Sequence, residues 1–287
     1  MQKILVFGAS GNLGKMICQA LKKEGYWLRI VVRSNISIPE IDEKADEKIM
    51  LDFNDEAALS CAVSNIDVII SALGKSVSLF DFSKPGFEDI DLKINLKILL
   101  SAAKLPVKKF IYISALGAEL YPELTYFKAH ESFSEALRNS GLKYTIIQPP
   151  AIFSAFHDLV ILSKKGLLFS VLGNGQQQTN PISEKDLAMV VINAIHTDVP
   201  LIKAGGKYIY TRLKINQLIN KNNNKRNFSI CIPFWLMSGF LPIVRWFDRN
   251  LYDKLAFYTA VFRKDVLAPP IGETSLETYL EELKKNG

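Results

Sequence analysis

The chain has 287 residues, a net charge of +6 and an apolar fraction of 48%. This length supports one domain or one and a half, with ample apolar residues for a large core, and the composition is that of a globular protein. The lysines are scattered along the chain, and the one small cluster, residues 221–227, is interpreted as a solvated loop, so no nucleic-acid partner is expected. No uninterrupted apolar run is long enough for a membrane span.

The cysteines and histidines give no sign of a disulfide framework or a metal site. Cys18 and Cys61 fall within helical patterns and are expected to be buried core residues of a protein in a reducing compartment. The histidines His130, His157 and His196 show no metal-ligand spacing, so no metal is expected. The first apolar run has five residues and ends in a glycine-rich stretch, unlike a signal peptide. The expected location is cytoplasmic.

Strand-like and helix-like patterns alternate through the first 150 residues. Strands are predicted over residues 3–7, 27–33, 49–52, 67–74, 110–114 and 144–148. Helical patterns are predicted over 15–21, 56–63, 91–104 and 127–140. Strands that are apolar on both faces and separated by helices form a parallel sheet covered on both sides. The prediction is a Rossmann-type, doubly wound α/β domain over residues 1–150, with a ligand at the carboxyl ends of the strands.

The alternation loosens from residue 151. Ser183 is predicted to cap a helix, residues 207–211 to form a strand, and residues 215–220 and 275–285 to form helices. We therefore expect a smaller, mostly helical substrate-side region over residues 151–287, interleaved with the first domain.

Residues 232–247 form an aromatic-rich segment. Pro233, Gly239 and Pro242 interrupt it, so it is not expected to cross a bilayer. A helix lying on a membrane surface is one interpretation, and peripheral membrane contact stays open. A substrate-side cap or a dimer face is favoured, because such a patch would otherwise face water. A monomer or a homodimer is expected.

The first strand ends in a glycine-rich turn. Gly8, Gly11 and Gly14 have the spacing G-x-x-G-x-x-G, and a helical pattern follows. A strand that feeds a helix N-terminus through glycines leaves backbone N–H groups directed at one place, which favours a phosphate. A tight turn with close helix packing would also need glycines. Because strand, turn and helix stand in the order that the motif requires, we predict a nucleotide-binding loop.

The second strand ends at Arg33, nineteen residues after Gly14. An acidic residue there would hold the ribose hydroxyls of NAD, whereas an arginine offers donors to the 2′-phosphate of NADP. A solvent-exposed arginine without a ligand is the plainer alternative. Given the glycine loop, the sequence favours NADP(H) over NAD(H).

Six stretches of the chain match a known family pattern: residues 8–14, 32–34, 71–74, 111–114, 140–150 and 180–188. They resemble the atypical and extended short-chain dehydrogenase/reductases, above all the NmrA-like and isoflavone-reductase-like branches. The resemblance covers roughly residues 1–200 well and the remainder weakly. Its most specific parts are the glycine loop and the S-G-L-x-Y-T-I-x-x-P stretch within 140–150.

The resemblance implies cofactor contacts by position. For the pyrophosphate these are Gly8, Ala9, Ser10, Gly11, Asn12, Leu13 and Gly14; for the adenosine end, Arg33 and Ser34; for the adenine, Asp52 and Phe53; along the cofactor, Ala72, Leu73 and Gly74; at the ribose, Lys128; and beside the nicotinamide, Pro149, Pro150, Ala151 and Ile152.

The implied catalytic set departs from the family pattern. Typical members use a Tyr-x-x-x-Lys pair, and Lys128 matches the lysine, but Leu124 stands four residues earlier. Tyr126 lies two residues before Lys128, and side chains at that spacing on a helix do not face each other. Tyr126 lies four residues before His130, so these two side chains do face each other, but histidine is a weaker cation than the lysine of the family pair. In the isoflavone-reductase-like branch a lysine without that tyrosine is the acid–base group. Lys128 is thus the leading catalytic candidate, Ser114 is implied to bond a carbonyl substrate, and Tyr126 is a weaker candidate.

Three functions remain open. The first is an NADP-dependent reductase of a small carbonyl or activated-alkene substrate. The second is an NmrA-type redox sensor that binds the dinucleotide without turnover, and the missing tyrosine makes it a serious alternative. An epimerase is less favoured, because such relatives usually keep the tyrosine.

Overall fold

The computed structural model describes residues 1–33, 41, 44–168, 170–226 and 228–285. Within them lies a sheet of seven parallel strands in the order β3-β2-β1-β4-β5-β6-β9. The strands are β1 (Lys3–Phe7), β2 (Trp27–Val32), β3 (Glu47–Met50), β4 (Val68–Ser71), β5 (Lys109–Ile113), β6 (Tyr144–Gln148) and β9 (Leu201–Lys203). The order reverses between β1 and β4, as in a doubly wound sheet.

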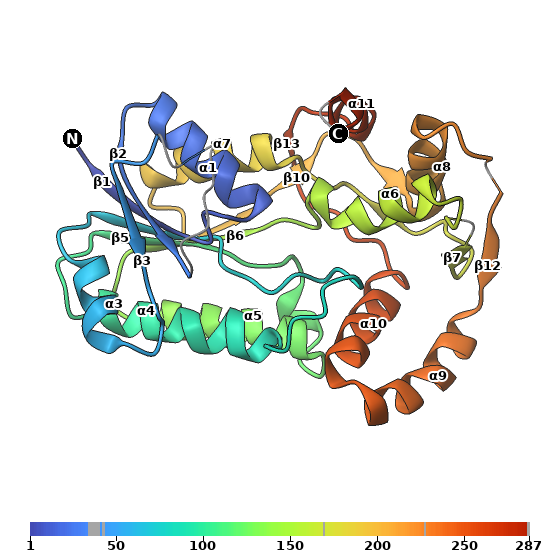
Figure 1. Ribbon diagram of the computed structural model, residues 1–287, viewed down its shortest axis with the longest axis horizontal. Coiled ribbons are helices and arrows are strands. Elements are labelled where there is room, and N and C mark those ends of the chain that lie inside the picture. Colours follow the sequence, from blue (N-terminus) through green and yellow to red (C-terminus); the bar gives the residue numbers. More distant parts are fainter. Residues whose placement is uncertain (34–40, 42–43, 169, 227, 286–287) are drawn as a thin grey trace.

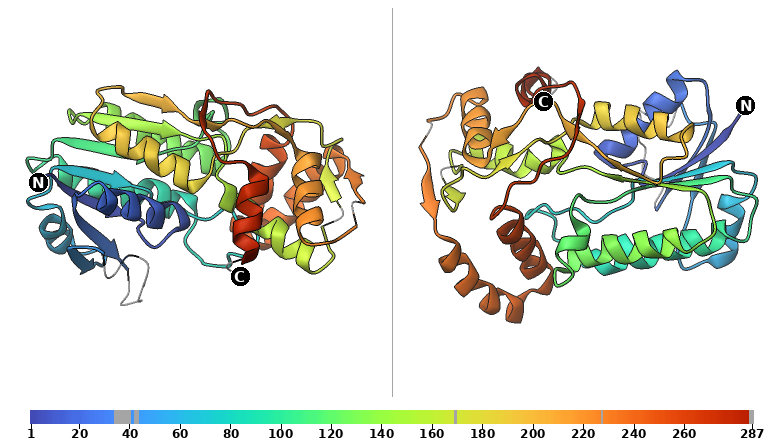
Figure 2. Two further views of the ribbon diagram at one scale, coloured as in Figure 1. Left: turned by 90° about the horizontal axis from the view of Figure 1, so that it is seen from above. Right: turned by 180° about the vertical axis from the view of Figure 1, so that it is seen from behind.

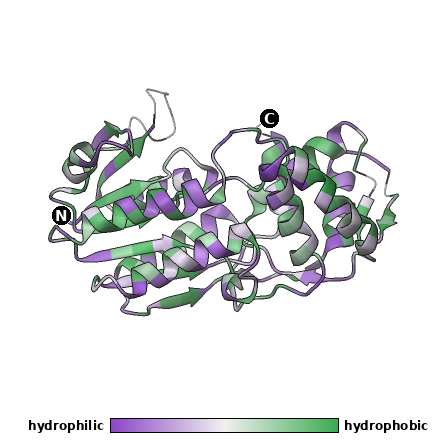
Figure 3. Ribbon diagram, turned by 90° about the horizontal axis from the view of Figure 1, so that it is seen from below, coloured by the Kyte–Doolittle hydropathy of each residue, from purple (hydrophilic) through white to green (hydrophobic). Residues whose placement is uncertain are grey.

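Helices cover both faces of this sheet, so the predicted Rossmann-type fold is confirmed (Figures 1 and 2). One face carries α1 (Asn12–Lys23) and α7 (Glu184–Ile195), and the other α3 (Glu56–Val63), α4 (Asn95–Ala102) and α5 (Thr125–Arg138). Alternate residues of each strand supply the two cores. In β1, Ile4 belongs to the core under α1 and α7, and Leu5 to the core on the other face. The strands are accordingly largely apolar, whereas the helices carry polar outer faces (Figure 3).

The remaining elements gather beyond the carboxyl edge of the sheet. They are η1 (Glu88–Ile94), η2 (Ala118–Leu120), η3 (Phe153–Phe156), α6 (His157–Lys164), β7 (Ser170–Leu172), β8 (Gln178–Thr179), β10 (Gly205–Gly206), β11 (Tyr210–Thr211), α8 (Arg212–Asn222), β12 (Ile230–Ile232), α9 (Phe234–Phe247), α10 (Arg249–Val261), β13 (Pro270–Gly272) and α11 (Leu276–Lys285). A separate small core joins α6, α8 and α11 around Phe153 and Ile219. None of the described helices combines the length and apolarity that a bilayer crossing requires.

Some predicted elements need correction. The third strand lies two residues earlier than predicted, because its pairing with β2 starts at Glu47, whose carboxylate binds Arg29 at 2.7 Å. The strand was predicted from the positions of apolar residues, and an ion pair between two charged residues does not show in such a pattern. Residues 234–247, for which the sequence left a helix open, form one helix that includes Gly239 and Pro242. Cys61, expected in the core, is exposed on α3.

Candidate cofactor and reaction site

The glycine loop is shaped by two close approaches. Gly8 has a φ of +81°, and a Cβ there would lie 2.6 Å from the Ala72 carbonyl oxygen at the end of β4. A Cβ on Gly14 would lie 2.0 Å from the Gly8 carbonyl oxygen. Gly11 is different, because the nearest atom to a Cβ there is 3.4 Å away and the residue is exposed. Gly8 and Gly14 are therefore needed for packing, whereas Gly11 leaves open space at the start of α1.

That open space suits an anion. Gly11 is the N-cap of α1 without a side-chain cap, and the first turn of the helix contains no acidic residue. The first backbone N–H groups of a helix lack partners within it and carry the positive end of the dipole. Ser10 and Asn12 are exposed beside them, while Ala9 and Leu13 anchor the loop in the core. The residues present fit a dinucleotide diphosphate.

The adenosine end of the predicted site lies at the ends of β2 and β3. Arg33 is exposed directly after β2, and its side chain makes no hydrogen bond or ion pair within the described part of the chain. Asp52 is also exposed, and its Oδ1 accepts from the Asn54 N–H. Phe53 is buried with its ring 6.1 Å from that of Phe7, so little of it is open to an adenine. Ser34 lies outside the described residues.

The chain after β4 is fixed by a polar network. Ser71 donates to the Asn95 side chain at 2.6 Å, and Asn95 donates to the Asp91 carbonyl oxygen at 2.9 Å. Asp91 Oδ2 accepts the Lys75 N–H at 3.0 Å. These contacts position Ala72, Leu73 and Gly74 along the sheet edge. Asp91 itself sits in η1, a π-helical segment, and such segments are frequent at functional sites.

Asp91, Tyr112 and His130 form a buried cluster behind this edge, and the half-buried Tyr126 packs beside them. His130 Nδ1 is 2.6 Å from the Tyr112 hydroxyl, and Nε2 is 3.4 Å from Asp91 Oδ1. The Tyr126 ring packs edge-on to His130 at 4.6 Å. Burial raises the pKa of Asp91 to about 8 and lowers the pKa of His130 to about 4. Both groups are therefore neutral near pH 7.

This neutrality affects Tyr126. Burial, followed by Asp91 and Tyr258, raises the pKa of Tyr126. Because neutral His130 supplies no positive charge, nothing in the cluster lowers that pKa toward the value a tyrosine acid needs. The sequence analysis did not predict Asp91 or Tyr112 as site residues. The signal available for Asp91 was its i, i+4 spacing to Asn95 in a helical run that also contains Lys93 and Lys97.

Ser114 directly follows β5 and Gln148 is the last residue of the neighbouring β6, at the same edge of the sheet. Ile113 pairs with Ile147, so the two residues that come next lie side by side. Both side chains are buried, and neither the Ser114 hydroxyl nor Gln148 Oε1 has a hydrogen-bond partner in the described structure. Buried polar atoms are normally paired, so these two oxygens are suited to a ligand.

The structure separates the other catalytic candidates. Lys128 is exposed on α5, whereas Tyr126 faces Phe257 of α10 at 4.6 Å. Glu131, one turn beyond Lys128, pairs with Arg138 at 2.9 Å. Lys128 and Tyr126 therefore lie on different sides of their helix.

The segment after β6 is tied to the start of α7. Pro149 accepts the Leu116 N–H, and Ala151 accepts the Ile182 N–H at 3.0 Å, while Ile152 bridges to Ile182. Pro150, between them, is half-buried. This pairing leads the chain from the sheet edge into η3 and α6.

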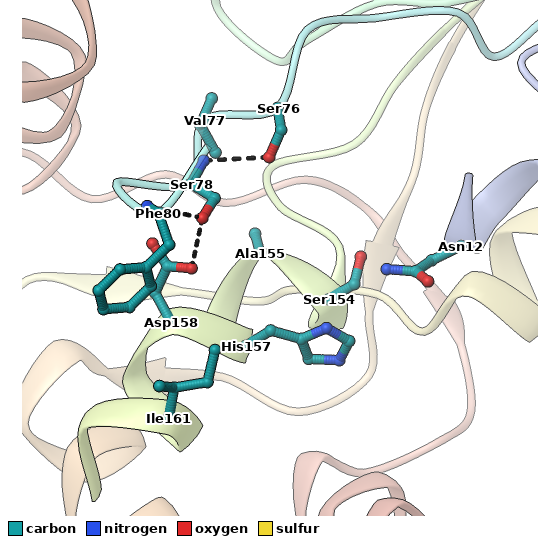
Figure 4. A pocket seen from close by; sticks show the side chains of 10 residues that line it. All are labelled: Asn12, Ser76, Val77, Ser78, Phe80, Ser154, Ala155, His157, Asp158 and Ile161. Atoms are coloured by element: carbon teal, nitrogen blue, oxygen red, sulfur yellow. Dashed lines mark hydrogen bonds between the residues drawn. The ribbon is translucent and has the colours of Figure 1, made fainter. Parts of the chain in front are cut away.

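A cavity of about 250 Å³ opens where β1, β4 and β6 end (Figure 4). Asn12 and Ser154 lie at one side of it and Phe80 and Ile161 at the other, and the remaining lining residues are Ser76, Val77, Ser78, Ala155, His157 and Asp158. Its walls are held by hydrogen bonds of 2.6 Å, one from Ser78 to Asp158 and one between His157 and Tyr279. Burial lowers the pKa of His157. The carboxyl ends of the strands are where open α/β sheets bind ligands.

No group of three or more His, Cys, Asp or Glu among the described residues is placed to hold a metal.

A family model described as NAD(P)H-binding matches residues 8–198. The chain belongs to that family, within the NmrA-like atypical short-chain dehydrogenase/reductases. The match begins at Gly8 of the glycine loop and ends just before β9.

Relatives along the whole chain agree with this family. The chain is 33% identical to the photosystem II assembly factor Ycf39 of Cyanophora paradoxa, over 97% of this chain and 91% of that protein. It is 25% identical to the chloroplastic divinyl chlorophyllide a 8-vinyl-reductase of Cucumis sativus, over 96% and 71%. A similar fold occurs in the NADPH complex of the Escherichia coli quinone oxidoreductase QOR2, with a TM-score of 0.73, 16% identity, and 98% and 99% of the two chains covered.

Proposed function

We propose that the chain is an NADP(H)-dependent reductase that acts on a small carbonyl compound or an activated alkene. The observation that carries the proposal is the buried Ser114 hydroxyl, which has no partner within the described residues at the sheet edge where the family binds its cofactor. A hydroxyl held there without a partner is suited to bonding a substrate oxygen. A reductase that acts on a vinyl group and a quinone oxidoreductase among the similar proteins support this reaction class.

In this proposal the bound nicotinamide supplies a hydride. The residues of the glycine loop hold the diphosphate, and Arg33 binds the 2′-phosphate, which gives the preference for NADP(H). Ser114 orients the substrate oxygen. Lys128 holds the ribose and delivers the proton, with Tyr126 as the weaker candidate. Residues 1–150 bind the cofactor and residues 151–287 supply the substrate side, in a cytoplasmic monomer or homodimer.

A specific observation favours a second candidate, a redox sensor that binds NADP(H) without turnover. Tyr126 is held among aromatic rings with a raised pKa, and its neighbour His130 is neutral near pH 7. Binding of the diphosphate at the glycine loop requires no proton transfer, whereas turnover through Tyr126 would.

The two candidates separate when NADPH oxidation is followed with a panel of quinones, aldehydes and ketones. The reductase predicts turnover that Lys128→Ala abolishes, while NADPH still binds, more weakly than to the unchanged chain because a ribose contact is lost. Lys104→Ala is the matched control, because Lys104 is exposed before β5, at the opposite edge of the sheet. Tight NADPH binding with no oxidation by any compound would instead establish the sensor.

A further inference from the structure

Helix α9 carries an apolar face that the rest of the described chain leaves uncovered. Of its fourteen residues only Val244 is buried, and α9 packs on α10 at the edge of the molecule, away from the sheet (Figure 1 and the right view of Figure 2). Trp235, Trp246 and Phe247 are 74%, 84% and 77% exposed. A patch of this kind on a protein surface marks an interaction site.

Seven of the exposed residues of α9 form one continuous stripe. At 100° per residue they span about 140° of the helix circumference, with no polar side chain among them. We call them the α9 stripe: Trp235, Leu236, Gly239, Phe240, Ile243, Trp246 and Phe247. Trp235 and Trp246 stand on nearly the same line along the helix, about 16 Å apart along its axis. Indole rings in such a line suit the headgroup level of a bilayer, with the helix parallel to the surface.

The segment of the chain that contains α9 is rich in basic residues. Residues 221–265 contain eight Lys or Arg and three Asp, which gives this segment +5 of the whole chain's net +6. Arg245 lies within α9, Arg249 follows it, and Arg263 donates to Ser238 of α9 at 2.7 Å. A basic rim around an apolar helix matches an anionic lipid surface.

We propose that the α9 stripe binds the chain to the surface of an anionic lipid bilayer. Pairing with a second copy would bring Arg245 and Arg263 of the two copies close together, which charge repulsion opposes. A protein partner would need hydrogen-bonding groups to fix its register, at about one bond per 100–200 Å², and the α9 stripe offers only the two indole N–H groups. Hydrocarbon and headgroups require no such register.

This contact would bring the membrane close to the candidate reaction site. Helix α10, on which α9 packs, holds the loop that lines the cavity. Lys254 donates to the Ser78 and Asp81 carbonyl oxygens, both at 2.6 Å, and Tyr258 donates to the Val77 carbonyl oxygen at 3.2 Å. Only one helix therefore separates the α9 stripe from the cavity wall.

Flotation of the full chain with vesicles tests the proposal. One vesicle preparation contains equal parts of phosphatidylglycerol and phosphatidylcholine, and the other contains phosphatidylcholine alone. The chain is expected to float with the anionic vesicles and to be released in molar salt, where the screening length falls to about 3 Å. Since two of its three tryptophans lie in the α9 stripe, their emission should shift to the blue on binding.

Variants identify the surface. Trp235→Gln with Trp246→Gln should weaken vesicle binding at least about tenfold, and Arg245→Gln with Arg249→Gln about tenfold on anionic vesicles. Phe82→Gln with Leu120→Gln is the matched control, since these side chains are 84% and 69% exposed outside α9, and it should float like the unchanged protein. Unchanged NADPH affinity shows that the variants fold.

Three outcomes would overturn the proposal. The unchanged chain fails to float with either vesicle, or the tryptophan variant floats as well as the unchanged chain. In the third, the unchanged chain does not float and sediments as a dimer, whereas the tryptophan variant sediments as a monomer. The α9 stripe would then be an interface between two copies of the chain.

Discussion

The two halves of the candidate site present different chemical groups: mainly backbone groups on one side and buried side chains on the other. On the β1–β2 side, backbone groups of a glycine loop and the exposed Arg33 face the space where a cofactor would lie. On the β4–β6 side, buried side chains from separate elements contact one another, as His130 does with the Tyr112 hydroxyl, and burial keeps Asp91 and His130 neutral near pH 7. Backbone groups at a helix N-terminus bind an anion at any ordinary pH, whereas a neutral buried cluster must be perturbed before it can move a proton. Binding and chemistry therefore have separate physical origins in this chain.

The largest effect is expected from Gly14→Ala. The added methyl would lie 2.0 Å from the Gly8 carbonyl oxygen, so α1 must move, which should cost about 1–3 kcal/mol of stability and abolish NADPH binding. Gly11→Ala is the matched control for packing, because its methyl meets nothing closer than 3.4 Å. It should keep the melting temperature but weaken NADPH about tenfold by obstructing the diphosphate. Thermal unfolding and fluorescence titration measure both; NADPH binding retained by Gly14→Ala would refute the assigned role of the loop.

Arg33→Asp tests whether the exposed arginine selects the cofactor. Charge-assisted hydrogen bonds to a 2′-phosphate are worth about 1.5–3 kcal/mol, so NADPH affinity should fall by about 10–100-fold. NADH affinity should rise, because aspartate accepts from the ribose hydroxyls. Titration with both cofactors gives the ratio, and Arg226→Asp, on an exposed loop, controls for the change in net charge. An unchanged ratio would leave Arg33 as a surface arginine.

The same contrast explains what could be predicted from the sequence. The glycine loop, β6 and the Ser183 cap of α7 depend on local chemistry, and all three lie where the pattern predicted them, with Ser183 accepting the Asp186 N–H. The seventh strand, Leu201–Lys203, was missed because three residues at a sheet edge, with Leu201 exposed, leave no apolar run.

The buried cluster could not be predicted for a different reason. His130 and Tyr126 share a helix, but Asp91 and Tyr112 reach them from other elements, and no local spacing connects those four residues. Likewise, the exposure of Cys61 depends on which face of α3 packs on the sheet, and the apolar content of that short helix does not distinguish its faces.

Asp91→Asn tests, through the pH dependence of the free energy of unfolding, whether the buried side of the site is neutral. The folded pKa of Asp91, about 8, lies above its unfolded value, so the native state holds the extra proton and stability falls as pH rises between them. His130, with a folded pKa of about 4, acts oppositely, but only below about pH 6.5. From pH 6.5 to 8 the unchanged chain should therefore lose about 2 kcal/mol, and Asp91→Asn should not. Urea unfolding at the two pH values measures the difference. Parallel losses in both proteins would show that Asp91 is ionised in the fold.

Ser114→Ala is expected to have the smallest effect. It separates a ligand-binding residue from a packing residue. The Ser114 hydroxyl has no partner in the described structure, so its removal should leave the melting temperature unchanged or slightly raised. Turnover should fall about tenfold if this hydroxyl bonds the substrate oxygen in the transition state. Ser163→Ala is the matched control, because that buried hydroxyl donates to Asn220 at 2.8 Å. Its loss should lower stability by about 1 kcal/mol and spare turnover. If Ser114→Ala instead behaves like Ser163→Ala in both measurements, the reaction side of the edge contains no substrate-binding hydroxyl at β5, and only its cofactor half binds a ligand.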